Sequence, residues 1–214
     1  MALREFVGEL DTYTEVGPLG IGGRRWRVWR AEASDKSPVV VKLPHSPADV
    51  AARWAAQVEV YRRIRGVQGP LGELFAVPYD FIDGEYGQIQ PYMQGYTLQE
   101  LIELWLTRRP TDDTMTRLRD RMWLAYQLAA AVEVLERIGV CHGDFSPGNV
   151  LLSKTASGPR LVLIDFDEAF ERDAGGTSLG TDDYRAPEVD AGGGATWASD
   201  RYALSVLIHF LLTR

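Results

Sequence analysis

The sequence predicts an α+β fold in which a first part rich in β-strands is followed by a mainly helical second part. Residues 13–43 contain short segments that alternate apolar and polar residues or are β-branched, and turn-forming residues separate them. From Thr97 onward, apolar residues recur at helical spacing over long segments. The composition changes near Gln94, which therefore marks the expected boundary between the two parts.

The first part is expected to contain three consecutive strands, one helix and two further strands. The strands are "TYTEVGPLG", "WRVWRAEA" and "VVVKL", and the turns "IGGRR" and "SDKSP" separate them. Pro47 and Asp49 open a helix that continues to about Arg65, because apolar residues follow at helical spacing. Two short strands are expected near 75–82 and 87–90, joined by the turn "DGEYG".

The second part begins with two predicted helices. They are the amphipathic "TLQELIELWLTRR" and the Ala-rich "RLRDRMWLAYQLAAAVEVLERIG", which ends at Gly139. Two short apolar strands, "VLL" and "LVLIDF", are expected around the turn "TASGP". Residues 171–195 are rich in Gly, Asp and Thr and predict a long loop, and a last helix starts at about Thr196.

Composition excludes several classes of protein. The chain has 214 residues, enough for one large domain or two lobes around a cleft. Its net charge of −7 argues against a nucleic-acid partner, and its single cysteine, Cys141, excludes an internal disulfide framework. The N-terminus lacks the pattern of a signal peptide, and no apolar run reaches membrane-spanning length. We therefore expect a soluble, cytoplasmic protein with no membrane partner.

The stretch "HGDFSPGNVLL" at 142–152 carries the strongest chemical signal. It brings a histidine, an aspartate and an asparagine close together, with Gly and Pro between them, directly before an apolar run. One interpretation is a polar turn that leads into a buried strand. The other is the catalytic loop of a phosphoryl-transfer enzyme, which also requires a lysine, a phosphate-binding turn and a second metal-binding acid elsewhere in the chain.

The rest of the chain supplies these parts in order. A Gly-rich turn is followed by "VVVK", a helix with a glutamate, "HGDFSPGN", "DFD", "APE" and "SDRYALSVLI". This set resembles the eukaryotic-type protein kinase superfamily from about Tyr13 to the last residue. The resemblance implies a two-lobed, protein kinase-like fold. Residues 1–93 would form an N-terminal lobe with an antiparallel, nucleotide-binding β-sheet and one main helix, and 94–214 a mainly helical C-terminal lobe.

The resemblance also assigns catalytic and metal-binding roles. Asp144 would accept the proton of the substrate hydroxyl or orient that hydroxyl, while Asn149 and Asp165 would bind Mg²⁺, with Mn²⁺ as an alternative. Lys42, at the end of a β-branched strand, would reach the α- and β-phosphates of ATP. Glu59, on the following helix, would hold that lysine in an ion pair.

The remaining residues of the expected ATP site also follow from the resemblance. Gly20 and Gly22 belong to the phosphate-binding turn, and Val28 lies on the strand that follows it. Gln90 occupies the gatekeeper position in "QPYMQGYTL". The backbone of Pro91 and Met93 would face the adenine edge, with Pro91 offering only its carbonyl because proline has no N–H.

The chain departs from the family pattern at several positions. Arg25 or Trp26 stands where the third glycine of the turn belongs, and Gly143 replaces the arginine before the catalytic aspartate. Ser146 occupies the position of the lysine typical of Ser/Thr kinases, and Asp167 replaces the glycine of Asp-Phe-Gly. Loss of the arginine makes control by phosphorylation of the activation loop less expected.

These departures leave three functions open. "HGD" with "PGN" also resembles aminoglycoside and choline phosphotransferases, and RIO kinases carry a serine at the position of Ser146. However, "GTDDYRAPE" and "SDRYALSVLIHFLL" resemble the peptide-binding loop and central helix of protein kinases, so we favour a divergent Ser/Thr protein kinase with protein substrates. A pseudokinase that serves as a binding or scaffolding module is the third reading.

The last helix raises a separate expectation. Its segment "ALSVLIHFLLTR" has almost no polar face, and a helix that is apolar all round is normally buried on every side. Protein kinases of this type continue for several helices beyond this one. We therefore expect that further helices of a longer chain complete the second lobe, or that another subunit covers the exposed face and forms an oligomer.

Overall fold

A computed structural model describes residues 4–19, 25–107, 118–155, 158–176 and 180–213. It divides the chain into two compact units. The first comprises 1–61 and 76–93, and the second comprises 62–75 and 94–214. The last boundary between the two units lies between Met93 and Gln94. The division differs from the expected lobes in one respect, because 62–75 belongs to the second unit and the boundary therefore crosses a helix.

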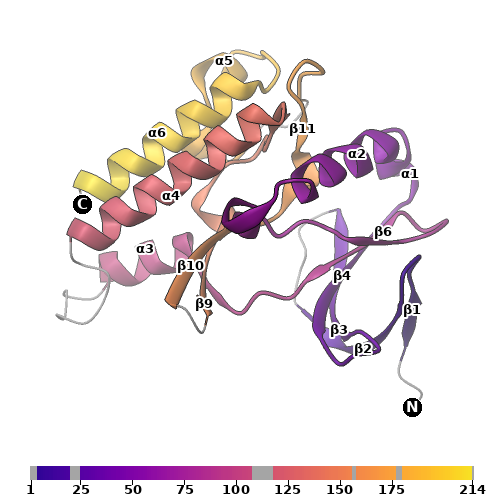
Figure 1. Ribbon diagram of the computed structural model, residues 1–214. Helices are drawn as coiled ribbons and strands as arrows, with labels where there is room; N and C mark the ends of the chain where they lie inside the picture. Colours follow the sequence, from indigo (N-terminus) through magenta and orange to yellow (C-terminus); the bar gives the residue numbers. More distant parts are fainter. Residues whose placement is uncertain (1–3, 20–24, 108–117, 156–157, 177–179, 214) are drawn as a thin grey trace. The chain divides into compact units, whose positions relative to one another are not determined.

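The first unit is built on a six-stranded sheet in which every pair of neighbouring strands is antiparallel (Figure 1). The strand order is β1-β2-β3-β4-β6-β5. The strands are β1 (Glu5–Val7), β2 (Thr12–Pro18), β3 (Trp26–Glu32), β4 (Pro38–Pro44), β5 (Asp80–Ile82) and β6 (Gly87–Pro91). The expected antiparallel sheet is therefore present, and β1 is an additional edge strand that the sequence analysis did not predict.

One face of this sheet carries the core of the first unit. Successive side chains of a strand point to opposite faces, so the alternate residues Val39, Val41 and Leu43 of β4 share a face. They pack with Ile89 of β6, and with buried residues of the other strands. Strand β4 is buried on both faces, and for this reason its sequence is a continuous β-branched run and not an alternation of apolar and polar residues.

The predicted single helix from Pro47 to Arg65 is wrong in detail. The structure contains a short α1 (Ala48–Ala51) and a longer α2 (Trp54–Arg65), with a turn between them. The N–H of Arg53 donates to the carbonyl of Val50, three residues earlier, so the chain tightens and changes direction there.

The predicted strand at 75–82 is also shorter than expected. Only Asp80–Ile82 forms a strand, and Gly69–Leu74 forms the 3₁₀ helix η1. Phe75 makes an isolated bridge with Leu163 of the second unit. Pro78 lies between these parts, and because proline lacks an N–H it cannot contribute a donor to a strand ladder.

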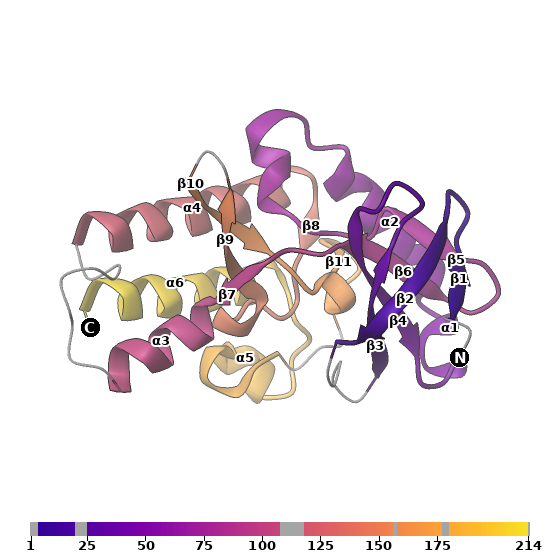
Figure 2. The same ribbon diagram turned by 90° about the horizontal axis from the view of Figure 1, so that it is seen from below.

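The second unit is mainly helical. Its helices are α3 (Leu98–Thr107), α4 (Leu118–Arg137), the short α5 (Pro187–Asp190) and α6 (Trp197–Thr213). Helices α4 and α6 lie side by side, as both views show (Figures 1 and 2). Helix α4 ends two residues before Gly139, whose φ of +72° is the left-handed conformation in which helices commonly terminate. No helix in the described ranges is long and apolar enough to cross a bilayer.

Two small sheets complete the second unit. Strands β10 (Gly158–Leu163), β9 (Val150–Thr155) and β7 (Gly95–Thr97) form one, and β11 (Phe170–Glu171) and β8 (Val140–Cys141) form the other. The region 171–195, expected to be a loop, also contains the 3₁₀ turn η4 (Asp182–Tyr184) and α5. Such one-turn elements are too short to produce a periodic signal in the sequence.

Helix α6 is only partly buried within the described chain. Ala203, Leu207 and Leu211, which recur every four residues, are buried, whereas Tyr202 and Leu212 are exposed by 40% and 42%. The apolar character on its remaining sides agrees with the pattern in the sequence. Coverage of these sides by further helices or by another subunit stays a prediction.

Candidate active site

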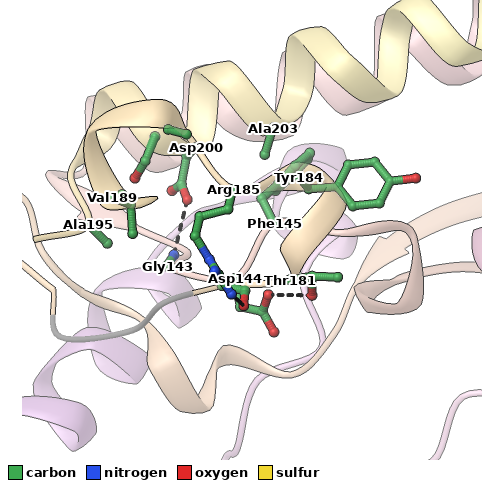
Figure 3. A pocket seen from close by; sticks show the side chains of 13 residues that line it. Gly143, Asp144, Phe145, Thr181, Tyr184, Arg185, Val189, Ala195, Asp200 and Ala203 are labelled. Carbon is green, nitrogen blue, oxygen red and sulfur yellow. Dashed lines mark hydrogen bonds between the residues drawn. The ribbon is translucent and has the colours of Figure 1, made fainter. Parts of the chain in front are cut away.

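The loop 142–149 is held in place by a buried carboxylate. Asp200, near the start of α6, accepts a hydrogen bond from the backbone N–H of His142 (2.6 Å). It also accepts one from the N–H of Gly143 (3.1 Å), which Figure 3 shows. Burial raises the pKa of Asp200, while the nearby His142 and these two N–H donors act in the opposite direction. A side chain from a helix 58 residues along the chain therefore sets the backbone at the start of the loop.

Gly143 is required by the backbone geometry of this loop. Its φ is +79°, and a Cβ atom there would lie 2.4 Å from the carbonyl oxygen of Glu168. Any side chain at 143 would therefore force the backbone apart. In this chain the loop therefore could not accept an arginine at 143 without a shift of the backbone.

His142 and Cys141 are buried supports rather than exposed reactive groups. Nε2 of His142 lies 3.2 Å from the carbonyl oxygen of Ile164, and its ring packs 4.6 Å from that of Phe166. Burial raises the pKa of the neighbouring Cys141 thiol to about 12, so this cysteine stays protonated near neutral pH. The histidine thus links the loop to the segment that follows β10.

Asp144 presents a carboxylate whose two oxygens are both engaged. Oδ1 accepts a hydrogen bond from the hydroxyl of Thr181 (2.9 Å), and Oδ2 accepts one from Nδ2 of Asn149 (3.2 Å). Nδ2 of Asn149 also donates to the backbone carbonyl of Asp144 (2.8 Å). The carboxylate is partly exposed and held in a defined orientation, as a group that must meet an incoming hydroxyl requires (Figure 3).

Thr181 is a site residue that the sequence analysis missed. It lies 37 residues from Asp144, and only the folded chain brings the two together. The threonine is part of the motif "GTDDYRAPE". That motif indicates a peptide-binding loop but gives no role to the threonine.

Asn149 and Asp165 lie at adjacent ends of two paired strands. Val150 of β9 faces Leu163 of β10, and the N–H of Ile164 donates to the carbonyl of Asn149 (3.0 Å). Because Nδ2 of Asn149 donates to Asp144, the side-chain oxygen Oδ1 of Asn149 is the atom that could bind a metal ion. No cluster of three or more His, Cys, Asp or Glu side chains suited to a metal ion occurs among the described residues. Two oxygen donors fit Mg²⁺, which proteins commonly bind through one or two side chains together with phosphates and water.

The backbone explains why aspartate is tolerated at 167. Asp165 itself adopts the left-handed conformation, with φ 62° and ψ 63°. Asp167 lies in the 3₁₀ turn η3 (Phe166–Glu168) and is not among the described residues with positive φ. The position therefore makes no demand that only glycine could meet.

A small pocket adjoins Asp144 (Figure 3). It is lined by loop residues, the segment from Gly180 to Val189, and parts of the α6 region, including Tyr184, Ala186, Ala195 and Ala203. Arg185 braces this segment: it forms ion pairs with Asp182 and Asp190 and donates to the carbonyl of Gly180. The hydrogen bond to Asp190 raises the pKa of Arg185.

In the first unit, three of the expected nucleotide-binding residues share one face of the sheet. Val28 of β3 pairs with Lys42 of β4, and Gln90 of β6 pairs with Val40, two residues from Lys42. Cross-strand partners project to the same face, so Val28, Lys42 and Gln90 lie together on the face opposite the core. Lys42 is only 8% exposed.

For Pro91, Met93 and Glu59, which are also expected to contribute to the nucleotide site, the structure gives the position and the exposure. Pro91 ends β6 and is exposed, Met93 is half-buried, and Glu59 is half-buried on α2. The ion pair of Glu59 with Lys42 stays a prediction. Gly20 and Gly22 lie outside the described residues.

Comparison with known proteins identifies the family. The model of the protein kinase domain matches residues 83–214, which is more than half of the chain. The chain belongs to the protein kinase family. The chain is 30% identical over 220 residues to the probable serine/threonine-protein kinase PkwA of Thermomonospora curvata, an alignment that covers 96% of the chain and 27% of PkwA. The chain thus spans about a quarter of the length of that relative.

Solved structures show the same fold. The kinase domain of ROP18, solved in complex with AMP-PNP and sucrose, matches at a TM-score of 0.75 with 21% identity, over 98% of the chain and 67% of that structure. ROP2 from Toxoplasma gondii, described as a virulence factor with a protein-kinase fold and no enzymatic activity, matches at 0.72 with 20% identity and the same coverage. The protein kinase-like fold expected from the sequence is therefore confirmed, while the fold by itself leaves activity undecided.

Proposed function

We propose that this kinase transfers the γ-phosphate of ATP to serine or threonine hydroxyls of proteins. The observation that carries the proposal is the fixed orientation of the Asp144 carboxylate. Its carboxylate is oriented by Thr181 and Asn149, and the loop that bears it is fixed by the buried Asp200. General-base assistance to a substrate hydroxyl requires a partly exposed carboxylate that is held in one orientation, and this arrangement supports that role.

Asp144 would accept or orient the proton of the attacking hydroxyl. Its Oδ1 faces the hydroxyl of Thr181. A substrate hydroxyl would approach this same carboxylate, where general-base assistance is typically worth about 10²–10⁴-fold in rate. Thr181 would hold the carboxylate in the productive orientation while the substrate is bound.

Asn149 and Asp165 would bind Mg²⁺ through their side-chain oxygens, and Mn²⁺ is an alternative. When bound, the metal neutralises charge on the phosphates. The pairing of β9 with β10 keeps these two residues adjacent, so the ligands would need little rearrangement.

The face of the first-unit sheet that bears Val28, Lys42 and Gln90 would bind the nucleotide. The apolar Val28 suits contact with a base, and the buried Lys42 suits contact with phosphate oxygens, with Glu59 as its counter-ion. Gly20, Gly22, Pro91 and Met93 would complete this nucleotide site, with residues 1–93 as the nucleotide-binding lobe and 94–214 as the catalytic lobe.

A protein acceptor is favoured over a small molecule by the segment beside Asp144. Residues from Gly180 to Ala195 form an ordered wall of the pocket, braced by Arg185, on which an extended peptide can lie next to the carboxylate. The relative PkwA is itself named a probable serine/threonine-protein kinase. We also propose a cytoplasmic location, in keeping with a buried, free Cys141.

The test is phosphoryl transfer from ATP labelled at the γ-phosphate, with Mg²⁺ and dephosphorylated casein as the acceptor, followed by phosphoamino-acid analysis. We expect Mg²⁺-dependent label on serine or threonine. Asp144→Asn should lower kcat by about 10²–10⁴-fold and leave nucleotide affinity nearly unchanged, because Asp144 is not assigned to nucleotide binding.

The matched control is Asp173→Asn, an exposed acid that follows β11, which should retain full activity. Nucleotide binding without transfer to casein or to the chain itself would favour the pseudokinase reading. Equal turnover in wild type and Asp144→Asn would remove Asp144 from the mechanism.

A further inference from the structure

The two edges of the first-unit sheet approach each other and leave an opening between them. The sheet runs from β1 at one edge to β5 at the other. The edges meet at one point, where the N–H of Glu9 donates to the carbonyl of Phe81 (3.0 Å). The N–H of Leu10 also donates to the buried carboxylate of Asp80 (3.1 Å), which fastens the end of β1 to β5.

Beyond this point, the backbone of β1 offers hydrogen-bonding groups on its outer edge. The carbonyl of Arg4 accepts from Glu15 of β2, and the N–H of Gly8 donates to Asp11, so even-numbered residues bond inward. Since backbone groups alternate along a strand, those of Glu5 and Val7 point away from β2. Glu9, two residues further on, follows the same alternation and bonds to β5.

The opening is a surface groove with a volume of about 470 Å³. It is lined by residues from Arg4 to Glu9 on one side and by Ile82, Asp83 and Glu85 on the other. Phe6 and Ile82, which also belong to the buried core, provide an apolar surface at its base. The volume is within the range of about 300–1,000 Å³ found for ligand sites.

The rim of the opening is acidic. The exposed residues Glu5, Glu9, Asp83 and Glu85 line it. The basic lining residue, Arg4, has its guanidinium over the rings of Phe6 (4.7 Å) and Trp29 (4.9 Å), and so is already engaged with aromatic faces. Val7, 65% exposed on the edge strand, adds an apolar contact beside these acids.

We propose that this opening binds an extended, basic segment of a partner protein by adding it as a strand to the edge of β1. Backbone groups of the segment would pair with Glu5 and Val7, apolar side chains would contact Phe6 and Ile82, and Lys or Arg side chains would face the acidic rim. Within the part of the chain that the structure describes, the outward backbone groups of Glu5 and Val7 are available to one added strand, and the acidic rim selects the charge of that strand. The site lies entirely within the first unit and does not depend on phosphoryl transfer.

The first experiment measures binding of a fluorescent peptide of alternating Lys or Arg and Val residues, Lys-Val-Arg-Val-Lys-Val-Arg, by anisotropy. The control peptide replaces every basic residue by Glu. We expect saturable binding of the basic peptide alone, weakening as salt rises. Hydrogen exchange should show added protection at 4–9 and 82–85. Binding of both peptides alike, or protection confined to other segments, would overturn the proposal.

Two pairs of variants separate backbone pairing from charge. Val7→Pro removes the outward N–H and should weaken binding about tenfold, whereas Val7→Thr keeps the N–H and should bind as wild type does. Glu5→Lys with Glu85→Lys should weaken binding about tenfold, whereas Asp49→Lys with Asp173→Lys, the same change of charge elsewhere, should have little effect.

Two further outcomes would contradict the proposed site. If Val7→Pro, Val7→Thr and the two double Lys variants all bound the basic peptide with equal affinity, the assigned site would be wrong. If the chain instead dimerises in sedimentation with rising concentration, and Val7→Pro abolishes the dimer, the occupant is a second copy and the proposed partner segment is wrong.

Discussion

The loop 142–149 and the Lys42 face of the first-unit sheet hold the side chains of the proposed site in different ways. The carboxylate of Asp144 is held by Thr181, which lies 37 residues further along the chain. The loop backbone before it is held by Asp200, which lies 58 residues from His142 and 57 from Gly143. Lys42 is held by the backbone ladder between β3, β4 and β6, to which its side chain contributes nothing. A loop has no ladder of its own, so buried polar side chains must provide the rigidity that strands obtain from their backbone.

This difference predicts opposite consequences for mutation in the two regions. On the sheet face, a side chain can be replaced without moving its neighbours, so function and stability should separate. In the loop, the groups that hold the backbone are also buried hydrogen-bonding partners. Their removal should therefore lower stability and activity together.

Among the substitutions that test this comparison and leave Asp144 in place, the largest effect is expected at Lys42. Lys42→Met keeps the apolar stem and the β4 ladder but removes the charge assigned to the phosphates. Phosphoryl transfer should fall by about 10²–10³-fold, as for other lost electrostatic contacts in active sites. The melting temperature without nucleotide should stay close to that of wild type. A large loss of thermal stability would show that the sheet depends on this side chain and would break the comparison.

The next effect is expected at Asp200. Asp200→Asn replaces one of two acceptor oxygens by an NH₂ group that faces a backbone N–H. The unfolding free energy should fall by about 1–3 kcal/mol, measured by urea denaturation, and phosphoryl transfer should fall with it. Asp173→Asn, at an exposed acid, should stay within about 0.5 kcal/mol of wild type. Lost activity with unchanged stability would mean that Asp200 does not hold the loop.

A smaller effect is expected at Thr181, which touches the carboxylate of Asp144 but is exposed. Thr181→Ala should lower kcat about tenfold, the equivalent of one hydrogen bond to a charged group, with little change in stability. Thr181→Ser keeps the hydroxyl and should recover most of the rate. If serine and alanine behave alike, the hydroxyl has no role in orienting Asp144.

The smallest effect is expected at Asp11, in the turn between β1 and β2. Hydrogen bonds from the backbone and hydroxyl of Ser34 hold the pKa of Asp11 below its ordinary value of 3.8. Because the folded-state pKa is the lower one, the stabilisation is present above pH 3.8 and is lost as the pH falls through the folded value. The unfolding free energies of wild type and Asp11→Asn, measured by urea denaturation, should therefore converge only once the pH lies below the folded-state pKa, which is lower than 3.8. A gap that persists at lower pH would argue against this linkage.

The apolar patterns of the sequence show how much of the secondary structure can be predicted from neighbouring residues alone. The β-branched run at Lys42 and the helical spacing of α3, α4 and α6 correspond to observed elements, because periodicity is set by neighbouring residues. The break between α1 and α2, and the replacement of strand by a 3₁₀ helix before Pro78, depend on local turns that periodicity does not resolve.

By itself, the sequence determined the α+β division near Gln94, the strand that bears Lys42, and the grouping of His142, Asp144 and Asn149 in one loop. Only the tertiary structure showed that Gly143 must lack a side chain, because the carbonyl of Glu168 approaches it. It also decided that Thr181 reaches Asp144 and that β1 leaves an open edge opposite β5. The first group depends on residues close together in the chain. The second arises where distant segments pack, and no local pattern records how closely they approach.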